Sequence, residues 1–199
     1  MMEIFLSDKI LKKNNHEIYI AMNKPVGYVC SAVSDSHKTV YELLSPQLQQ
    51  FVSTPKRGHK LHTIGRLDCN TSGLLLFTTD GFFSHKLTSP ESKTEKTYIV
   101  TLKKRGDKTY IQKASQGLIL PAEKKSPEQI CLPIVLSPLD ETFFKWKVKI
   151  TEGKFHQVRR IFSALENEVE SLQRTKIGNF LLPKNLKPGD YCFFNPQIL

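Results

Sequence analysis

A loop carboxylate that directly precedes an apolar strand is the residue of this chain best placed to do chemistry. Residues 65–73 read Gly-Arg-Leu-Asp-Cys-Asn-Thr-Ser-Gly, and residues 74–81 read Leu-Leu-Leu-Phe-Thr-Thr-Asp-Gly. The short apolar run predicts a strand buried on both faces, and the polar turn residues before it predict a loop. Asp68 would then be exposed on a loop that a rigid strand positions. An Asx-turn or a cap is the commoner role for such an Asp, and composition alone favours it.

A second stretch places a tyrosine at the start of a strand. Residues 95–102 read Glu-Lys-Thr-Tyr-Ile-Val-Thr-Leu, and their β-branched and aromatic content predicts a strand. Alternation puts Tyr98, Val100 and Leu102 on one face. Tyr98 is therefore either a core residue or a residue of a functional site.

A third stretch, Glu-Gly-Lys-Phe-His-Gln-Val-Arg-Arg at residues 152–160, opens a predicted helix whose apolar stripe begins at Val158. Arg159 and Arg160 are adjacent, so they cannot both point the same way. The alternative to a functional role is a pair of solvated helix arginines.

The elements that must position these residues alternate between strands and short helices joined by hairpins. This order predicts an α+β fold with a mainly antiparallel sheet. One predicted hairpin joins residues 131–136 to residues 143–151, and its second strand carries Lys145, Lys147 and Lys149 on one face. That row of lysines is either a solvated face or a phosphate-contacting stripe, and the sequence leaves both open.

Composition limits the class of partner. The chain has 199 residues and a formal net charge of +10, which favours a polyanionic partner. Its four cysteines form no C-x-x-C pair, so neither a zinc site nor a disulfide framework is expected. A polar loop is expected over residues 47–60. His59 within it and His62 just after it are more simply surface histidines than metal ligands. With no apolar run of membrane-spanning length, we expect a soluble, cytoplasmic protein.

The three stretches together resemble motifs of pseudouridine synthases, in the branch that includes RsuA and its large-subunit relatives. The string Gly-Arg-Leu-Asp-x-x-Thr-x-Gly-Leu-Leu-Leu-x-Thr-x-Asp-Gly carries the resemblance most strongly, and Asn-Lys-Pro-Val-Gly at residues 23–27 adds to it. The resemblance covers residues 18–195. It implies an antiparallel sheet with short flanking helices and a central catalytic cleft, formed by two closely packed subdomains within residues 18–199. Residues 1–17 would be an extension in place of the family's usual N-terminal RNA-binding module.

The resemblance also implies roles for particular residues. Asp68 would be the catalytic residue, with Tyr98 in the active site and Arg159 paired with Asp68. A neighbouring Arg typically lowers an Asp pKa by about 1–3 units, which keeps the carboxylate charged. Leu172 would pack against the target base. Candidate RNA contacts, named from motif membership, are Lys24, Arg66, Lys96, His156, Arg160 and Arg174.

The reaction implied is the cofactor-free and metal-free isomerisation of a uridine in ribosomal RNA, by a monomer acting on rRNA or on a ribosomal assembly intermediate. Closer similarity to RsuA favours small-subunit (16S) RNA. Two alternatives remain. One is a large-subunit (23S) enzyme of the RluE type, and the other is a non-catalytic RNA-binding assembly factor. A pure binder would not need Asp68, Tyr98 and Arg159 together.

Overall fold

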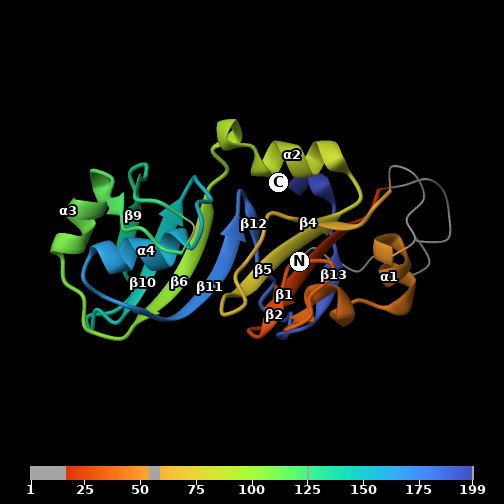
Figure 1. Cartoon of the computed structure of the whole chain (residues 1–199), viewed down its shortest axis with the longest axis horizontal. Coiled ribbons are helices and arrows are strands. Elements are labelled where there is room, and N and C mark those ends of the chain that lie inside the picture. The colour runs from red at the N-terminus through yellow and green to blue at the C-terminus, as the bar shows by residue number, and fades with distance from the viewer. Residues whose placement is uncertain (1–16, 54–58, 125, 199) are drawn as a thin grey trace. The chain divides into compact units, whose positions relative to one another are not determined.

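The structure is a computed structural model that describes residues 17–53, 59–124 and 126–198 (Figure 1). The chain divides into two compact units. The first unit comprises Met1–Ser92 and Asn179–Leu199, and the second comprises Lys93–Gly178. Of the expected N-terminal extension, residues 1–16 lie outside the described ranges.

The first unit is built on an antiparallel sheet with short helices beside it. Its strands are β1 (Tyr19–Lys24), β2 (Tyr28–Val29), β3 (Lys38–Thr39), β4 (His62–Ile64), β5 (Ser72–Thr78), β12 (Phe180–Leu181) and β13 (Tyr191–Phe193). Its helices are η2 (Val40–Leu43), α1 (Pro46–Ser53), α2 (Gly81–Thr88), η3 (Pro90–Ser92) and η4 (Pro196–Ile198). Helix α1 corrects the prediction of a loop from residue 47 onward, because Leu48 is fully buried and Phe51 and Val52 on the same helix face are partly buried.

Strands β1 and β5 form the centre of the first unit. They pair antiparallel from Tyr19 opposite Thr78 to Lys24 opposite Gly73, while β13 pairs with β1 and β4 pairs with β5. Residues 74–77 of β5 are fully buried, which confirms the predicted strand buried on both faces. The loop that carries Asp68 therefore ends in a buried strand.

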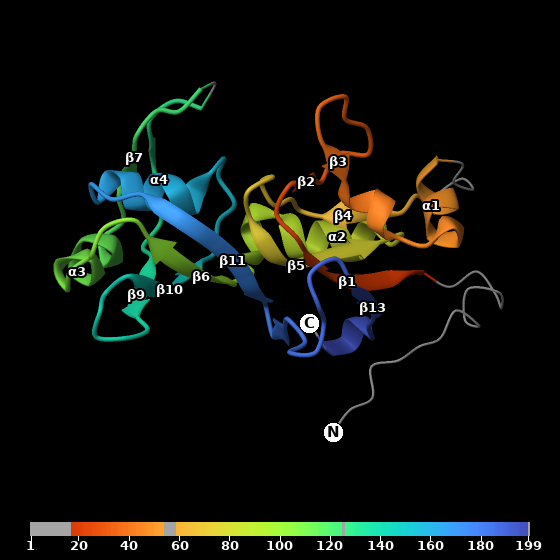
Figure 2. The same cartoon turned by 90° about the horizontal axis from the view of Figure 1, so that it is seen from below.

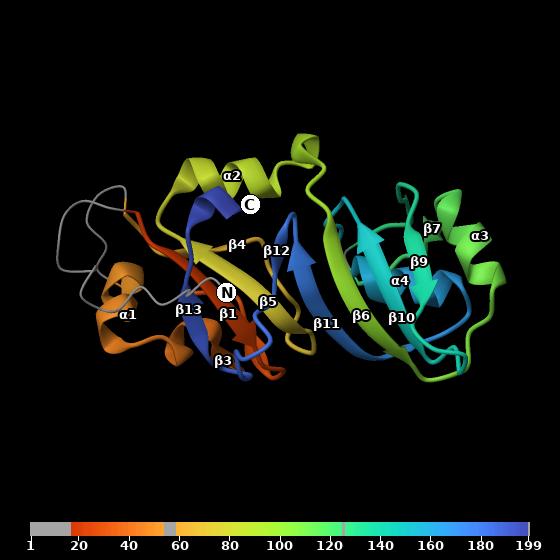
Figure 3. The same cartoon turned by 180° about the vertical axis from the view of Figure 1, so that it is seen from behind.

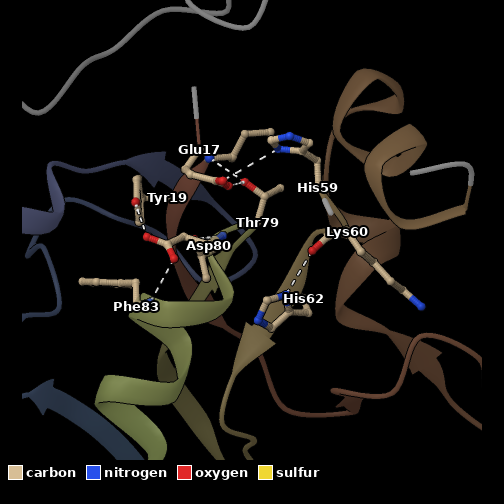
Figure 4. A network of polar contacts seen from close by, with 10 residues as sticks. Glu17, Tyr19, His59, Lys60, His62, Thr79, Asp80 and Phe83 are labelled. Atoms are coloured by element: carbon tan, nitrogen blue, oxygen red, sulfur yellow. Dashed lines mark hydrogen bonds and ion pairs between the residues drawn. The ribbon is translucent and has the colours of Figure 1, made fainter. Parts of the chain in front are cut away.

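A polar network fixes the far end of β5 to the start of β1 and to α2 (Figure 4). The Asp80 carboxylate accepts hydrogen bonds from the Phe83 N–H at 3.0 Å and from the Tyr19 hydroxyl at 2.7 Å. Thr79 Oγ1 donates to Glu17, whose carboxylate also lies 3.8 Å from His59 Nδ1. Asp80 thus caps α2 and holds β1 beside it.

The second unit also combines an antiparallel sheet with short helices. Its strands are β6 (Lys96–Leu102), β7 (Ile119–Leu120), β8 (Gln129–Ile130), β9 (Val135–Pro138), β10 (Lys145–Ile150) and β11 (Val169–Ile177), and its helices are α3 (Thr109–Ser115) and α4 (Gln157–Ala164). The main sheet has the order β11-β6-β10-β9, and every neighbouring pair in it is antiparallel. The predicted hairpin is present as β9 and β10. The α+β class with a mainly antiparallel sheet is confirmed in both units.

Helices α3 and α4 supply aromatic rings to one face of this second sheet, and α4 lies against that face in Figures 2 and 3. Trp146 of β10 is fully buried there, with its ring centroid 5.7 Å from that of Tyr110 on α3. The Tyr110 ring in turn lies 6.4 Å from that of Phe162 on α4. Among the helices of the described ranges, none is long and apolar enough to cross a membrane.

Candidate active site

The Asp68 loop connects β4 to β5 and begins with Gly65, whose φ of +68° favours glycine. Asp68 is partly exposed, whereas Leu67 before it and Thr71 after it are buried. The Asp68 carbonyl accepts a hydrogen bond from the Thr71 N–H at 3.0 Å, which closes a turn. The flanking residues thus anchor the loop.

Lys24, the last residue of β1, binds the backbone of this loop. Its side chain is fully buried, and its ammonium group donates hydrogen bonds to the carbonyls of Asp68 (3.1 Å), Cys69 (3.3 Å), Thr71 (2.8 Å) and Pro25 (3.0 Å). A buried charge is tolerated only where several polar partners replace its water. The prediction that Lys24 contacts RNA is therefore wrong, because its charge is enclosed and already bonded to backbone.

Cys30 supports the same loop from another direction. Its sulfur lies 3.3 Å from both the N–H and the carbonyl of Leu67, as acceptor and as donor. The Gly27 N–H donates a 2.9 Å bond to the Cys69 carbonyl. Of the residues predicted to contact RNA in this unit, Arg66 is the one exposed.

In the second unit, three predicted site residues share one face of the sheet. Tyr98 on β6 lies directly opposite Arg174 on β11, and the next pair on the same face is Val100 opposite Leu172. Tyr98 is also opposite Val148 on β10. Tyr98 and Leu172 are 7% and 5% exposed, so each is well enclosed by its neighbours.

Arg174, a predicted RNA contact, is only 3% exposed. Its charge acts on a neighbouring group within the unit. Burial and the nearby Arg174 guanidinium both lower the pKa of Lys96, which lies at the start of β6. Lys96 Nζ donates to the Thr94 carbonyl at 3.0 Å. Two basic groups thus lie close to one another at the Tyr98 end of β6, and such an arrangement favours a nearby anion.

The N-terminus of α4 presents the third motif. His156 has a left-handed φ of +46°, stacks on Phe155 with ring centroids 3.8 Å apart, and lies 2.8 Å from Glu123 through Nδ1. Arg159, one turn further, donates from NH1 to the Val169 carbonyl at 3.3 Å. Asp68 belongs to the first unit and Arg159 to the second.

Arg160 has a structural role. It is 2% exposed and donates to the carbonyls of Pro121, Phe155, Leu120 and Pro127 and to Ser126 Oγ, over distances of 2.7–3.3 Å. The prediction of an RNA contact is wrong for this residue, because its guanidinium fastens the β7–β8 connection to α4.

Sequence reasoning missed two supporting residues, Cys30 and Glu123. No role is predicted for Cys30, one of the four cysteines without a C-x-x-C pair, and Glu123 lies in a lysine-rich stretch that predicts an ordinary loop. Neither has a local signal, since each acts on a residue more than thirty positions away.

Both the sequence and the fold of this chain match known proteins. Residues 18–164 match the family described as RNA pseudouridylate synthase. The ribosomal small subunit pseudouridine synthase A of Haemophilus influenzae is 39% identical over 189 residues, which is 95% of this chain and 75% of that protein. The protein of the same name from Escherichia coli K12 is 39% identical over 173 residues, which is 87% of this chain and 68% of that one.

A solved structure agrees with the sequence matches. The crystal structure of a pseudouridylate synthase superposes with a TM-score of 0.79 at 37% identity, covering 92% of this chain and 72% of that one. The family match and the shared fold thus define a pseudouridine synthase. The chain belongs to the RNA pseudouridylate synthase family.

Proposed function

We propose that the chain converts a uridine of small-subunit (16S) ribosomal RNA to pseudouridine. The choice of this substrate is supported by the 39% identity, over 95% of the chain, to a relative named for the ribosomal small subunit. The proposed partner is rRNA or a ribosomal assembly intermediate, met by a monomer in the cytoplasm.

The reaction is an isomerisation in which atoms and electrons balance within the nucleotide. The bond from C1′ of the ribose to N1 of uracil breaks, the base rotates, and C1′ bonds to C5. C5 then loses its proton and N1 gains one. The chemistry proposed for this chain needs no redox step, metal or cofactor.

Asp68 is the proposed catalytic group. Its carboxylate would attack the sugar or the ring, or remove a sugar proton, and each role requires the ionised form. Lys24 and Cys30 fix the backbone on both sides of it. Arg159, paired with Asp68, would keep the carboxylate charged while the target base excludes water.

The target uridine must leave its stack in folded RNA, at a cost of a few kcal/mol. Tyr98 would supply an aromatic face for the extruded base, worth about 1–3 kcal/mol, and Leu172 an apolar contact. Both side chains lie on one face of neighbouring strands, which supports a shared pocket for the base. Arg66, Lys96 and His156 remain the proposed contacts to RNA, so affinity should fall steeply with salt.

The decisive measurement is tritium release from 16S rRNA transcripts carrying uridine labelled at C5. Wild-type protein should release label, and Asp68→Asn should release none while still binding the transcript. Asp107→Asn, which changes an exposed carboxylate in the second unit, is the matched control and should remain active. Turnover by Asp68→Asn would exclude Asp68 from the chemistry.

Release of label from 23S transcripts alone would assign the large-subunit RNA as the substrate. Binding without any release by wild type would indicate a non-catalytic assembly factor.

A further inference from the structure

A row of lysines lies on the face of the second sheet opposite its aromatic core. In β10 the inward residues Trp146, Val148 and Ile150 are at most 4% exposed. Alternation therefore turns the lysines between them, at positions 145, 147 and 149, to the other face. Lys145 is exposed, and the other two are partly exposed. The row thus keeps access to solvent, on the face away from α4 (Figure 3).

The strand register shows that the residues directly beside these lysines are neutral. On β6 the opposing residues are Thr101, Ile99 and Thr97. On β9 they are Ser137, opposite Lys147, and Val135, opposite Lys149. One strand further, β11 continues this face with Ser171, Gln173 and Lys176. The face therefore gains a fourth lysine. The paired positions across it hold no acid, and Glu170 lies at the register shift beside Ser171, at the far end from Lys176.

Ion pairing offsets little of this charge. Lys149 Nζ lies 3.2 Å from Glu95, at the end of the row. In the described part of the chain, no ion pair is found for Lys145, Lys147 or Lys176. Successive lysines on one strand face are about 6.7 Å apart, and like charges on one sheet face repel. The arrangement is unfavourable for the protein alone, and a polyanion would relieve it.

The composition of the face indicates which part of a nucleic acid it fits. Base stacking needs aromatic rings, and the register positions of this face hold Thr, Ser, Gln, Val, Ile and Lys. Lysine on a flexible stem suits phosphate oxygens, whose contacts position RNA without reading its sequence. The ligand chemistry is therefore the phosphate backbone.

We propose that this lysine face, made of Lys145, Lys147, Lys149 and Lys176, binds the phosphate backbone of an RNA segment outside the one that carries the target uridine. Tyr98 projects from the opposite face of β6, so a base at Tyr98 and a phosphate on Lys147 belong to different parts of the RNA. That the bound RNA is 16S rRNA rests on the proposed function. The lysine face adds a docking surface that raises affinity for long substrates.

The test is the salt dependence of binding to a full-length 16S rRNA transcript. The triple variant Lys145→Gln, Lys147→Gln, Lys149→Gln should reduce the slope of log K against log salt by roughly 2–3, since each phosphate contact contributes about 0.7–0.9. A matched triple, Lys104→Gln, Lys108→Gln, Lys113→Gln, removes the same charge from exposed positions elsewhere in the same unit and should change the slope by less than about one. At saturating transcript, kcat of both variants should equal that of wild type.

Three results would overturn the inference: an unchanged slope, an equal loss in the matched triple, or a reduced kcat in the first triple alone. Urea unfolding checks that both variants fold. Should the first triple unfold, Lys145→Gln, the most exposed single change, should still lower the slope by about one. The binding measurement does not depend on catalysis. An inactive wild-type protein would therefore reject the proposed function, and the lysine face could still be tested by RNA binding.

Discussion

The buried ammonium group of Lys24 donates a 3.1 Å hydrogen bond to the main-chain carbonyl of Asp68. The same group bonds to the Cys69 and Thr71 carbonyls, so one lysine from β1 holds three positions of the loop. The acceptors are backbone atoms, and Asp68 as a whole is partly exposed. Lys24 therefore positions the proposed catalytic residue through the main chain.

Replacing Lys24 by Met should destabilise the protein and loosen the loop. Met fills similar volume but leaves the carbonyls without a donor, and each buried unsatisfied group costs about 1–3 kcal/mol. We expect a loss of about 2–4 kcal/mol in urea unfolding, with a larger fall in kcat than in RNA affinity. Lys38→Met, at an exposed residue of the same unit, is the control. An equal fall in affinity and kcat would contradict a positioning role.

Arg160→Lys should destabilise the second unit despite keeping the charge. The guanidinium reaches four carbonyls and one hydroxyl, whereas an ammonium group has three donors. We expect a loss of about 1–3 kcal/mol for the buried acceptors left unpaired. Hydrogen exchange should become faster in residues 119–130. A weaker affinity for RNA with unchanged stability would instead restore Arg160 as an RNA contact, because lysine cannot reproduce bidentate guanidinium contacts.

The fold was predictable where the pattern is local. The apolar run at 74–77 and the alternation at 145–150 each determine which side chains face the core, and both were confirmed. Helix α1 was missed although Leu48, Phe51 and Val52 have the i, i+3, i+4 spacing of a helix face, because this pattern covers little more than one turn. Its stability comes from tertiary packing, which a local pattern does not show.

The candidate site was predictable as a set of motifs, but motif membership did not separate contacts from supports. Lys24, Arg160 and Arg174 are basic residues in a basic chain, so all three were expected at the RNA surface. Each is at most 3% exposed. A basic side chain can be buried when backbone carbonyls or a sheet enclose it, and those partners come from distant positions that spacing cannot reveal.

Gly106→Ala should destabilise the second unit through overpacking. A Cβ there would lie 2.9 Å from Tyr110 Cε2 and 3.1 Å from two atoms of the Trp146 indole. These rings are packed against one another, so relief requires shifts in the core, at about 1–3 kcal/mol. Gly81→Ala, at the start of α2, is the matched control, because a Cβ there meets nothing within 4 Å. We expect the control to be neutral or slightly stabilising in urea unfolding. Similar losses in both variants would contradict the packing argument.

Asp80 should make stability depend on pH in acid. Burial alone would raise its pKa, but hydrogen bonds from the Phe83 N–H and the Tyr19 hydroxyl hold the pKa below its ordinary value of 3.8. Between the folded and unfolded pKa values the unfolded chain binds more protons, so stability rises with pH there. The contribution of Asp80 is thus complete above about pH 4 and is lost as pH falls through the folded pKa.

Two substitutions separate the charge of Asp80 from its capping role. Asp80→Ala should lose about 1 kcal/mol at pH 7, because the first turn of α2 loses its cap. Asp80→Asn keeps a good capping residue, so its smaller deficit at pH 7 should shrink as pH is lowered from 5 to 2. Urea unfolding across this range gives both quantities, with Glu91→Gln as a control that removes an exposed carboxylate nearby. A deficit of Asp80→Asn that stays constant down to pH 2 would show that the folded protein does not depress this pKa, because the charged form would then contribute nothing that protonation removes.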